Sequence, residues 1–299
     1  MDARDEILKL KEERNAIILS HNYQLPEVQD VADFLGDSFG LSKKASESDA
    51  DVIVFCGVKF MAETAAILAP KKTVLMPDIQ AGCPLANMIT VEKLKQLQAQ
   101  HPGAPTVTYV NTNADVKAES DYCCTSANAL KVVEAVDADE IIFVPDKYLG
   151  HYIAGKTDKK LIIWNGYCPT HVKITAEDIR RQKKAHPKAE VMVHPECTPD
   201  VIELSDYVFS TGGMCRHPKE SKAPDFIVGT EVGILHRLAK ENPGKKFYPA
   251  SELAVCPNMK KTTLDKVLLS LKEMKHEVRV PKEISARAKK SIERMLELV

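Results

Sequence analysis

The sequence predicts an α/β protein built from three similar αβα units, each with a short parallel sheet, and with further helices at both ends. The first observation behind this prediction is that short apolar runs alternate with helical patterns, which is typical of parallel sheets covered on both faces. The second is that a lone Cys-Pro pair follows an apolar run three times, at Cys83, Cys168 and Cys256, in steps of 85 and 88 residues. Such regular recurrence indicates three copies of one unit.

The element order is the same in every unit, after an opening helix expected over residues 2–13. Each unit begins with an apolar strand that ends in polar residues, at 17–23, 107–113 and 191–196. A helical segment and a triplet of small residue, Asp and aromatic follow; the triplets are centred on Asp33, Asp121 and Asp206. A hydroxyl residue stands five positions after each Asp. The order of these markers therefore supports the triplication.

The second half of each unit repeats as well. It contains a buried-type strand, another helix and a Lys-Lys pair that precedes a last strand. The buried-type strands are expected at 52–55, 141–144 and 226–228, and the last strands at 71–76, 159–164 and 245–248. We expect the Lys-Lys pairs to lie in solvated loops. The predicted domains are residues 1–105 with the N-terminal helix, 106–189, and 190–299 with two C-terminal helices split near Pro281.

The composition excludes several classes of protein. The chain has 299 residues, 28% charged and 44% apolar, which is enough for two or three domains with their own cores. With a net charge of −1, the chain as a whole does not attract nucleic acid or an anionic membrane electrostatically. Apolar runs stay shorter than the roughly 18 residues of a membrane span, and residues 1–6 are too acidic for a signal peptide. We therefore expect a cytoplasmic location, without nucleic acid or membrane partners.

The eight cysteines indicate metal binding or catalysis, because a cytoplasmic location disfavours a disulfide framework. No pair has CxxC spacing, so a metal site must draw its cysteines from distant parts of the chain. Proline suits the first helical position, which would place each Cys-Pro cysteine at a helix N-terminus that favours the thiolate. Three converging thiolates could bind zinc plus water, or a 4Fe-4S cluster with one open iron. Cys56, Cys123, Cys124 and Cys215 are expected to be structural, and Cys197 is left unassigned.

Polar residues at the ends of the first strands form a second candidate set. His21, Asn111 and His194 are read as equivalent positions, and Tyr23 and Glu196 each lie two residues further on. Tyr109 precedes Asn111 by two residues, and His171 lies one helical turn beyond Cys168. Because ligands bind beyond the carboxyl ends of parallel strands, these groups predict a site for a small polyanion such as a dicarboxylate. Tyr23 and Glu196 are the expected proton-transfer groups.

The hydroxyl residues form a third set at strand-to-helix turns. They are Ser38, Ser126, Ser210 and Thr211. Helix capping explains some of them. A helix N-terminus with hydroxyls is also a natural phosphate or carboxylate site, and three such termini could bind a phosphorylated or multi-carboxylate ligand.

Several motifs occur in one order along essentially the whole chain: Ser20-His21-Asn22-Tyr23-Gln24, Gly36-Asp37-Ser38, Tyr109-Val110-Asn111, Thr125-Ser126-Ala127-Asn128, Cys168-Pro169-Thr170-His171, His194-Pro195-Glu196-Cys197, Ser210-Thr211-Gly212 and Asn258-Met259-Lys260. Together they resemble the quinolinate synthase (NadA) family of NAD biosynthesis. The resemblance implies three α/β domains around a pseudo-threefold axis and a 4Fe-4S cluster held by Cys83, Cys168 and Cys256. Two departures from the family pattern are Tyr167, where many relatives have His, and the absence of a CxxC-type set around Cys256.

The resemblance also implies a reaction, in which iminoaspartate condenses with dihydroxyacetone phosphate to give quinolinate, phosphate and water. The open iron would act as a Lewis acid, and Tyr23 and Glu196 would move protons. Transient contact with an aspartate-oxidising enzyme is compatible with this chemistry. The residues implied to line the substrate site are His21, Tyr109, Asn111, His171 and His194, with Ser38, Ser126, Ser210 and Thr211 for carboxylate or phosphate groups. The residues alone leave open a zinc lyase or hydrolase and a non-catalytic iron–sulfur sensor.

Overall fold

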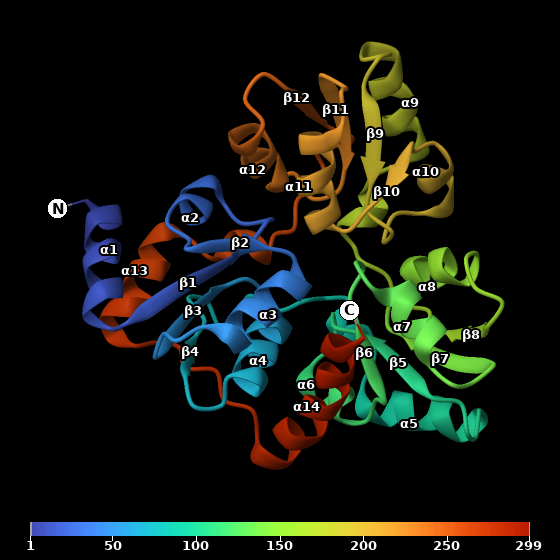
Figure 1. The fold of residues 1–299 in the computed structure, drawn as a ribbon, viewed down its shortest axis with the longest axis horizontal. Helices are drawn as coiled ribbons and strands as arrows, with labels where there is room; N and C mark the ends of the chain where they lie inside the picture. The colour runs from blue at the N-terminus through green and yellow to red at the C-terminus, as the bar shows by residue number, and fades with distance from the viewer. Residues whose placement is uncertain (1, 299) are drawn as a thin grey trace.

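The computed structural model describes residues 2–298 and contains three four-stranded sheets in which all strands run parallel. The strand orders are β2-β1-β3-β4, β6-β5-β7-β8 and β10-β9-β11-β12, so the three sheets have the same topology. Figure 1 shows the sheets as three lobes with helices on their faces. The predicted α/β class with three similar units is confirmed.

The first lobe follows the N-terminal helix, whose N-cap is Asp2. Its elements are α1 (Ala3–Glu13), β1 (Ala16–His21), α2 (Pro26–Asp30), β2 (Phe34–Gly36), α3 (Ser38–Glu47), β3 (Val52–Cys56), α4 (Lys59–Leu68), β4 (Thr73–Leu75), the 3₁₀ helix η1 (Ala86–Met88) and α5 (Val91–Gln100). All five residues of β3 are buried, as expected for a central parallel strand covered on both faces.

The second and third lobes repeat this order, with first strands shorter and central strands slightly longer than the sequence predicted. The second contains β5 (Thr106–Tyr109), α6 (Ala114–Ala118), β6 (Tyr122–Cys124), α7 (Ala129–Ala135), β7 (Glu140–Val144), α8 (Lys147–Ala154), β8 (Lys160–Ile163), η2 (His171–Lys173) and α9 (Ala176–Ala185). The third contains β9 (Glu190–Val193), α10 (Pro199–Glu203), β10 (Tyr207–Val208), α11 (Thr211–Glu220), β11 (Asp225–Gly229), α12 (Ile234–Glu241), β12 (Lys246–Pro249) and η3 (Met259–Lys261). His21 and Tyr109 are the last residues of β1 and β5, and the polar residues that follow them lie in loops, as does His194 after β9.

The repeated aspartates make one contact in all three lobes. Each carboxylate accepts a hydrogen bond from a backbone N–H of the first strand, and the N–H of the same aspartate donates to the carbonyl of that strand residue. The carboxylate bonds join Asp33 to Ile18 (2.7 Å), Asp121 to Thr106 (2.8 Å) and Asp206 to Val191 (2.8 Å). These aspartates therefore fix the start of the second strand against the first and set the register of each sheet.

The expectation that both lysines of each Lys-Lys pair are solvated is wrong for one lysine in every lobe. Lys72, Lys159 and Lys245 each donate to backbone carbonyls at or near the end of the helix that follows the second strand. The acceptors are Ser48 and Ala50, Glu134 and Val136, and Pro218 and Ser221. A cation there satisfies carbonyl groups that a helix end leaves unpaired. The pairs are therefore part of the repeated scaffold.

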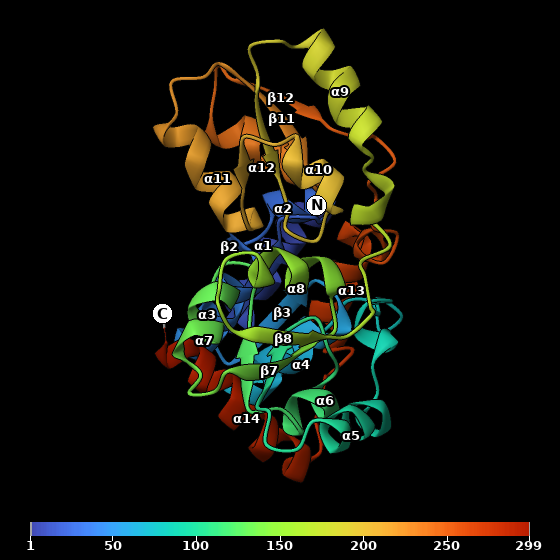
Figure 2. The ribbon, with the colours of Figure 1, turned by 90° about the vertical axis from the view of Figure 1, so that its right-hand side faces the viewer.

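The two C-terminal helices, α13 (Leu264–Glu273) and α14 (Lys282–Glu297), return to the first and second lobes. Helix α13 packs against α1, α2 and β3, whereas α14 packs against α6, β6 and α4. Figures 1 and 2 show both helices, in red, away from the third lobe, to which the chain order assigned them. The predicted split falls at Pro281, the N-cap of α14. The domain boundaries at residues 105 and 189 stay a prediction.

The largest apolar cluster contains residues from all three sheets, including Leu19 of β1, Phe143 of β7 and Met192 of β9. The lobes are therefore joined by a shared core, and the carboxyl ends of their strands face a common centre. No helix within residues 2–298 has the length and hydropathy needed to cross a membrane.

Candidate active site and metal centre

The three Cys-Pro sites adopt one backbone geometry. Each cysteine carbonyl accepts a hydrogen bond of 3.3 Å from the N–H four residues later, at the start of a short 3₁₀ helix. The bonds run from Asn87 to Cys83, from Val172 to Cys168 and from Lys260 to Cys256. Each cysteine lies three residues before a single 3₁₀ turn, η1, η2 or η3. The N-caps of these turns are Leu85, Thr170 and Asn258, so the prolines precede the helices and do not occupy the predicted first helical position.

All three thiols stay protonated near neutral pH in the absence of a cation. Burial raises the pKa of Cys83 to about 12 and also raises the pKa values of Cys168 and Cys256. Backbone N–H groups two and three residues beyond each cysteine pull in the other direction, as a helical N-terminus should. The effect of burial is larger than that of these N–H groups. The cysteines are therefore thiols without a bound cation, not the thiolates that the N-terminal position alone would favour. A bound cation would deprotonate the thiols.

The strand-end residues correct one predicted equivalence. Because Asp33, Asp121 and Asp206 bond Ile18, Thr106 and Val191, the strand positions three residues further on are the equivalent ones. Those positions are His21, Tyr109 and His194, so Tyr109, not Asn111, is the counterpart of the histidines. Two residues further on, Asn111 is the counterpart of Tyr23 and Glu196. The two sets form inner rings around the common centre.

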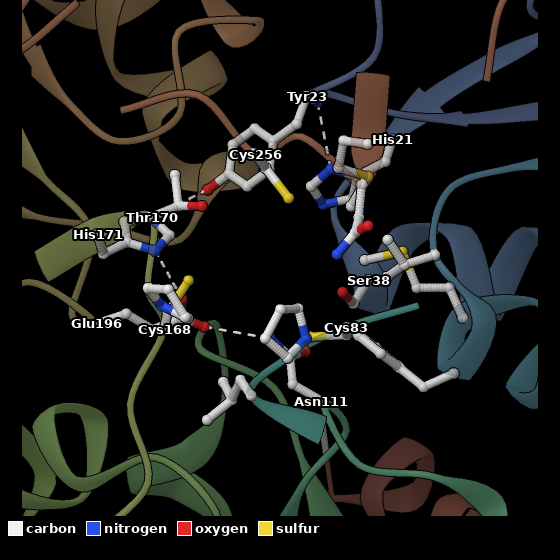
Figure 3. Close-up of a pocket in the computed structure, with 18 of the residues that line it drawn as sticks. His21, Tyr23, Ser38, Cys83, Asn111, Cys168, Thr170, His171, Glu196 and Cys256 are labelled. Carbon is white, nitrogen blue, oxygen red and sulfur yellow. Dashed lines mark hydrogen bonds and ion pairs between the residues drawn. The ribbon is translucent and has the colours of Figure 1, made fainter. Parts of the chain in front are cut away.

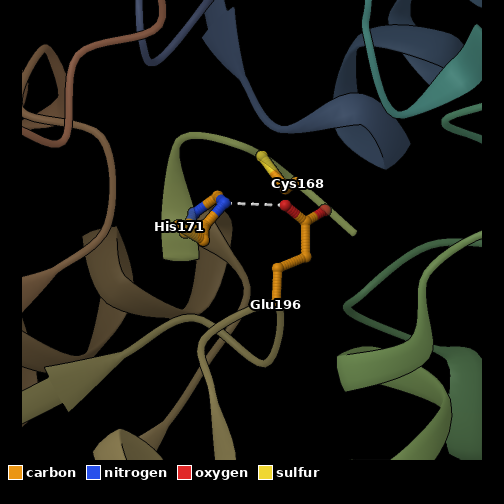
Figure 4. Close-up of side chains that lie close together, drawn as sticks. All are labelled: Cys168, His171 and Glu196. Atoms are coloured by element: carbon orange, nitrogen blue, oxygen red, sulfur yellow. Dashed lines mark ion pairs between the residues drawn. The ribbon is translucent and has the colours of Figure 1, made fainter. Parts of the chain in front are cut away.

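Glu196 is the most heavily contacted member of these rings. Its Oε1 accepts hydrogen bonds from Tyr109 Oη (2.6 Å) and Asn111 Nδ2 (3.2 Å), and its Oε2 lies 2.7 Å from His171 Nδ1. Burial alone would raise the pKa of Glu196, but His171 and His194 beside it, with the hydrogen bonds, hold the pKa at about 2. The side chain is therefore a buried carboxylate at neutral pH. Figure 4 shows its carboxylate facing the ring of His171, with Cys168 beside the pair.

A chain of polar atoms continues from His171 to the first lobe. His171 Nε2 lies 2.8 Å from Thr230 Oγ1, which in turn lies 2.5 Å from Tyr23 Oη. Burial and the nearby Glu196 charge raise the pKa of Tyr23 well above its usual value, so its hydroxyl stays protonated. Thr230, directly after β11, was missed from the sequence because a threonine after a strand is an ordinary residue there. The contacts connect Glu196 to Tyr23 through His171 and Thr230.

His21 and His194 are neutral imidazoles with one fixed tautomer. Burial lowers the pKa of each to about 3. In both, Nδ1 accepts the backbone N–H of the residue two positions later, Tyr23 (3.2 Å) or Glu196 (3.3 Å), so the proton sits on Nε2. His194 Nε2 then donates to Ser126 Oγ, 3.2 Å away. The two histidines therefore present N–H donors toward the centre.

One pocket brings together the polar residues chosen from the sequence, with one exception. It is lined by His21, Tyr23, Ser38, Cys83, Tyr109, Asn111, Ser126, Cys168, His171, His194, Glu196, Thr211 and Cys256. Figure 3 shows side chains from all three lobes facing this pocket, the three cysteines among them. Ser210 is not among the described residues that line it; Ser210 caps α11 and lies 3.4 Å from Asp37 Oδ2. Asp37 lines the pocket and was missed, because its position as the N-cap of α3 explains it equally well.

The other cysteines lie in apolar cores. Cys123, Cys124 and Cys215 belong to the largest apolar cluster, and Cys56 and Cys197 to the clusters of the first and third sheets. The prediction that Cys56, Cys123, Cys124 and Cys215 are structural agrees with this placement. Tyr167 is 38% exposed and is not among the described pocket residues; Lys147 Nζ lies over its ring.

The spacing of the sulfur atoms bears on the kind of metal group that fits. Within residues 2–298, the set of three metal-type ligand atoms that lie within 4.8 Å of one another is Cys168, His171 and Glu196, and the three cysteine sulfurs do not form such a set. A tetrahedral zinc with Zn–S bonds of about 2.3 Å would hold its sulfurs about 3.8 Å apart. The three thiols thus surround a space wider than one zinc ion requires. They remain close enough for charge on Cys83 to raise the pKa of Cys168.

These features define the class of protein: an α/β enzyme of three repeats that encloses a buried pocket of thiols, imidazoles and one carboxylate at the junction of its lobes. Comparison with known proteins identifies the family. Residues 5–297 match the family model described as quinolinate synthetase A protein. The chain is 57% identical over 296 residues to quinolinate synthase of Thermodesulfovibrio yellowstonii, covering 99% of this chain and 98% of that one. It is 56% identical over 295 residues to quinolinate synthase 1 of Methanosarcina acetivorans, covering 99% and 97%. The chain belongs to the quinolinate synthetase A family.

Proposed function

We propose that this enzyme condenses iminoaspartate with dihydroxyacetone phosphate to form quinolinate, phosphate and water in NAD biosynthesis. The observation that carries the proposal is the convergence of one cysteine from each lobe with a buried Glu196 in a single pocket. Family membership supports the same reaction, since curated relatives over 50% identical are named quinolinate synthases.

We further propose that Cys83, Cys168 and Cys256 hold a 4Fe-4S cluster with one open position. The width of the space between the thiols and the purely sulfur donor set fit such a group better than a single ion. When bound, the cluster would supply Lewis-acid polarisation of a substrate oxygen or nitrogen during dehydration. All the remaining steps are assigned to side chains.

Substrate carboxylate and phosphate groups would bind where hydroxyls meet helix N-termini. Ser38 and Thr211 are the first residues of α3 and α11, and Ser126 lies just before α7. The Nε2–H of His21 and the amide of Asn111 add neutral donors to the same pocket. Donors without net charge orient an anion without holding it so tightly that the product cannot leave. Ser210 would act indirectly, by capping α11.

Proton movement would run along the contacts that join Glu196 to Tyr23. As a carboxylate, Glu196 can accept a proton from substrate at an oxygen that is already oriented by Tyr109 and Asn111. His171 and Thr230 lie within 2.8 Å of their neighbours in this chain, so they can pass a proton toward Tyr23 Oη. Tyr23, whose raised pKa keeps its hydroxyl protonated, is the group at the other end of these contacts that would donate to a leaving oxygen and regain a proton through Thr230.

The test is anaerobic purification followed by metal and activity measurements. We expect brown protein with about four irons and four sulfides per chain, and formation of quinolinate from the two substrates. Colourless protein that contains stoichiometric zinc and stays inactive after anaerobic reconstitution would contradict the proposal.

Single serine substitutions test the ligand set. Replacing Cys83, Cys168 or Cys256 should abolish the colour and reduce turnover at least about 100-fold, since removing a ligand disrupts a metal group more than removing its outer partners does. Matched controls are serine substitutions at Cys56, Cys123, Cys124 and Cys215, which should retain iron. Equal iron loss in the controls would contradict the assignment.

A zinc lyase is the second candidate, favoured by the mutual approach of the ligand atoms of Cys168, His171 and Glu196 within 4.8 Å. Such a site would not need Cys83. Zinc retained in Cys83→Ser would therefore support it, and loss of all metal would exclude it. An iron–sulfur sensor would retain the metal without making quinolinate, and would shift a DNA fragment in a gel assay. A cytoplasmic location and contact with an aspartate-oxidising enzyme stay predictions.

A further inference from the structure

The loops that carry the three cysteines are attached to their sheets at equivalent places. In each lobe, a backbone N–H just beyond the buried central strand donates to the carbonyl two residues before the cysteine. The bonds run from Lys59 to Ala81 (2.8 Å), from Lys147 to Gly166 (2.8 Å) and from Val232 to Ala254 (3.1 Å). Because this contact is common to all lobes, the residues immediately before the donors can be compared directly. They are Val58, Asp146 and Glu231.

In the third lobe this residue holds the cysteine backbone. Glu231 is fully buried, and its Oε1 accepts the N–H of Cys256 at 3.1 Å. Its Oε2 accepts the N–H of Gly233 at 2.7 Å, and Lys260 Nζ lies 2.9 Å from Oε1. The carboxylate is thus fixed at both oxygens and balanced by a cation. It ties the end of β11 to the first residue of the metal-binding turn.

In the second lobe the shorter Asp146 occupies the same place. It is also fully buried, and its Oδ1 accepts the N–H groups of Tyr148 and Leu149, at 2.9 Å each, which fixes its orientation as the N-cap of α8. Its Oδ2 has no hydrogen-bond partner within residues 2–298. Burial and the charge of Glu196 raise the pKa of Asp146 well above its usual value, and the backbone N–H of Cys168 acts in the opposite direction. The loop passes so close that a side chain at Gly166 would strike the carbonyl of Pro145.

In the first lobe the position is apolar. Val58 is buried in the largest apolar cluster, and its side chain has no oxygen that could accept the N–H of Cys83. Val58 is nevertheless the N-cap of α4, with the extended backbone that a capping Asp would adopt. The first cysteine loop is therefore attached by its shared backbone bond without the carboxylate that the other two have.

We propose that Asp146 and Glu231 are positioning residues for Cys168 and Cys256, and that the Cys83 loop, which lacks such a carboxylate, is the first of the three to open when the metal group enters or leaves. The inference rests on the three cysteines forming one ligand set, as proposed above. Two preorganised thiols would receive an incoming group, and the third would close over it. The same asymmetry makes Cys83 the ligand released first when the group is lost.

The test measures alkylation of each cysteine in the reduced apoprotein, by mass spectrometry under anaerobic conditions. In Glu231→Leu, Cys256 should be alkylated at least about tenfold faster than in the unmodified chain, because its N–H loses a charged acceptor, whereas Cys83 should be unchanged. The conservative Glu231→Gln retains an oxygen acceptor and should restore most of the protection. Likewise, Asp146→Leu should expose Cys168 selectively, and Asp146→Asn should restore it.

The reciprocal variant is Val58→Asp, which adds the missing carboxylate at a position that suits a cap. It should slow alkylation of Cys83 and, after reconstitution with iron and sulfide, slow iron release to a chelator. If Val58→Asp does not fold, the comparison of Glu231→Leu with Glu231→Gln still tests the proposal. An unchanged rate at Cys256 in Glu231→Leu, or equal acceleration at all three cysteines, would overturn the proposal. Since the alkylation needs no metal, a failure here is distinct from a failure to find a 4Fe-4S cluster.

Discussion

In each lobe, the aspartate that sets the strand register bonds a residue only three positions before the strand-end residue, yet the aspartates and the strand-end residues differ in one respect. Asp33, Asp121 and Asp206 keep one residue type and one contact in all three lobes. At the strand-end positions, by contrast, the side chains differ between lobes: His21, Tyr109 and His194. Two residues further along the chain, the three lobes have Tyr23, Asn111 and Glu196.

The difference follows from what each set contacts. The aspartates bond backbone, which is the same in every lobe, so the same carboxylate serves three times. The strand-end residues face a pocket at the junction of the lobes, where one asymmetric substrate would meet three different walls. A threefold scaffold can therefore carry an active site without threefold chemistry. Three experiments would break or sharpen this contrast.

The largest effect is expected from Glu196→Gln. Removing the carboxylate while keeping its shape should lower turnover about 10²- to 10⁴-fold, which is the usual contribution of a positioned acid or base. The three cysteines are untouched, so iron content and colour should persist. Steady-state quinolinate formation and the visible spectrum measure the two effects. Normal turnover would remove Glu196 from the mechanism.

An intermediate effect is expected from acid, which should act on the strand-end residues. His21 and His194 have pKa values of about 3 in the folded chain against an ordinary value of 6.5, so the unfolded chain binds more protons as the pH falls below 6.5. Their contribution to stability is complete above pH 6.5 and is lost progressively toward pH 3. When the pH is lowered from 6.5 to 5.5, we expect each histidine to reduce the free energy of unfolding by about 1 kcal/mol. Urea unfolding of the apoprotein at the two pH values measures the slope.

The control for acid sensitivity is His194→Gln, which should flatten the pH dependence by about half because one of the two titrating imidazoles is gone. Glu196, with its pKa lowered from 4.5 to about 2, adds a loss of the same sign at lower pH. An unfolding free energy that stays constant from pH 6.5 to 5.5 would contradict the assignment of neutral buried imidazoles.

The smallest effect on turnover is expected from the aspartates. Asp206→Ala should lower the free energy of unfolding by about 1–3 kcal/mol, because the Val191 N–H loses its carboxylate acceptor. At temperatures where the variant is folded, its turnover should be normal. Glu220→Ala, at an exposed carboxylate in the same lobe, is the matched control and should change stability by less than about 0.5 kcal/mol. A loss of turnover in folded Asp206→Ala would contradict the separation between scaffold residues and site residues.

Much of the fold was readable because the scaffold repeats its residues. The Asp triplets, the Cys-Pro pairs and the Lys-Lys pairs each stand at equivalent places, and the sheets follow from them. The strand-end register was predicted two residues off in the second lobe, because Asn111 looks like the polar counterpart of His21 whereas Tyr109 looks like a strand residue. Counting three residues on from the strand position that each Asp bonds would have given the correct match, but that bond is visible only in three dimensions.

The site was only partly readable for a related reason. Tyr23 and Thr230 are separated by 207 residues, and their contact depends on how the first and third lobes pack. Asp37 and Ser210 have local explanations as helix caps that hide any further role. The paired placement of Asp146 and Glu231 was also invisible, since their sequence surroundings differ and only the shared backbone bond aligns them.

The position of α13 bears on the order in which the chain becomes folded during its synthesis. The first sheet is complete by residue 75, but the apolar cluster around Ile18 and Leu75 also takes Val267 and Leu271 from α13. At roughly 5–20 residues per second, the intervening stretch of about 190 residues takes a ribosome about 10–40 s to produce. The lobe made earliest therefore waits for a helix made near the end of synthesis, and during that interval its uncovered apolar face is a natural target for a chaperone.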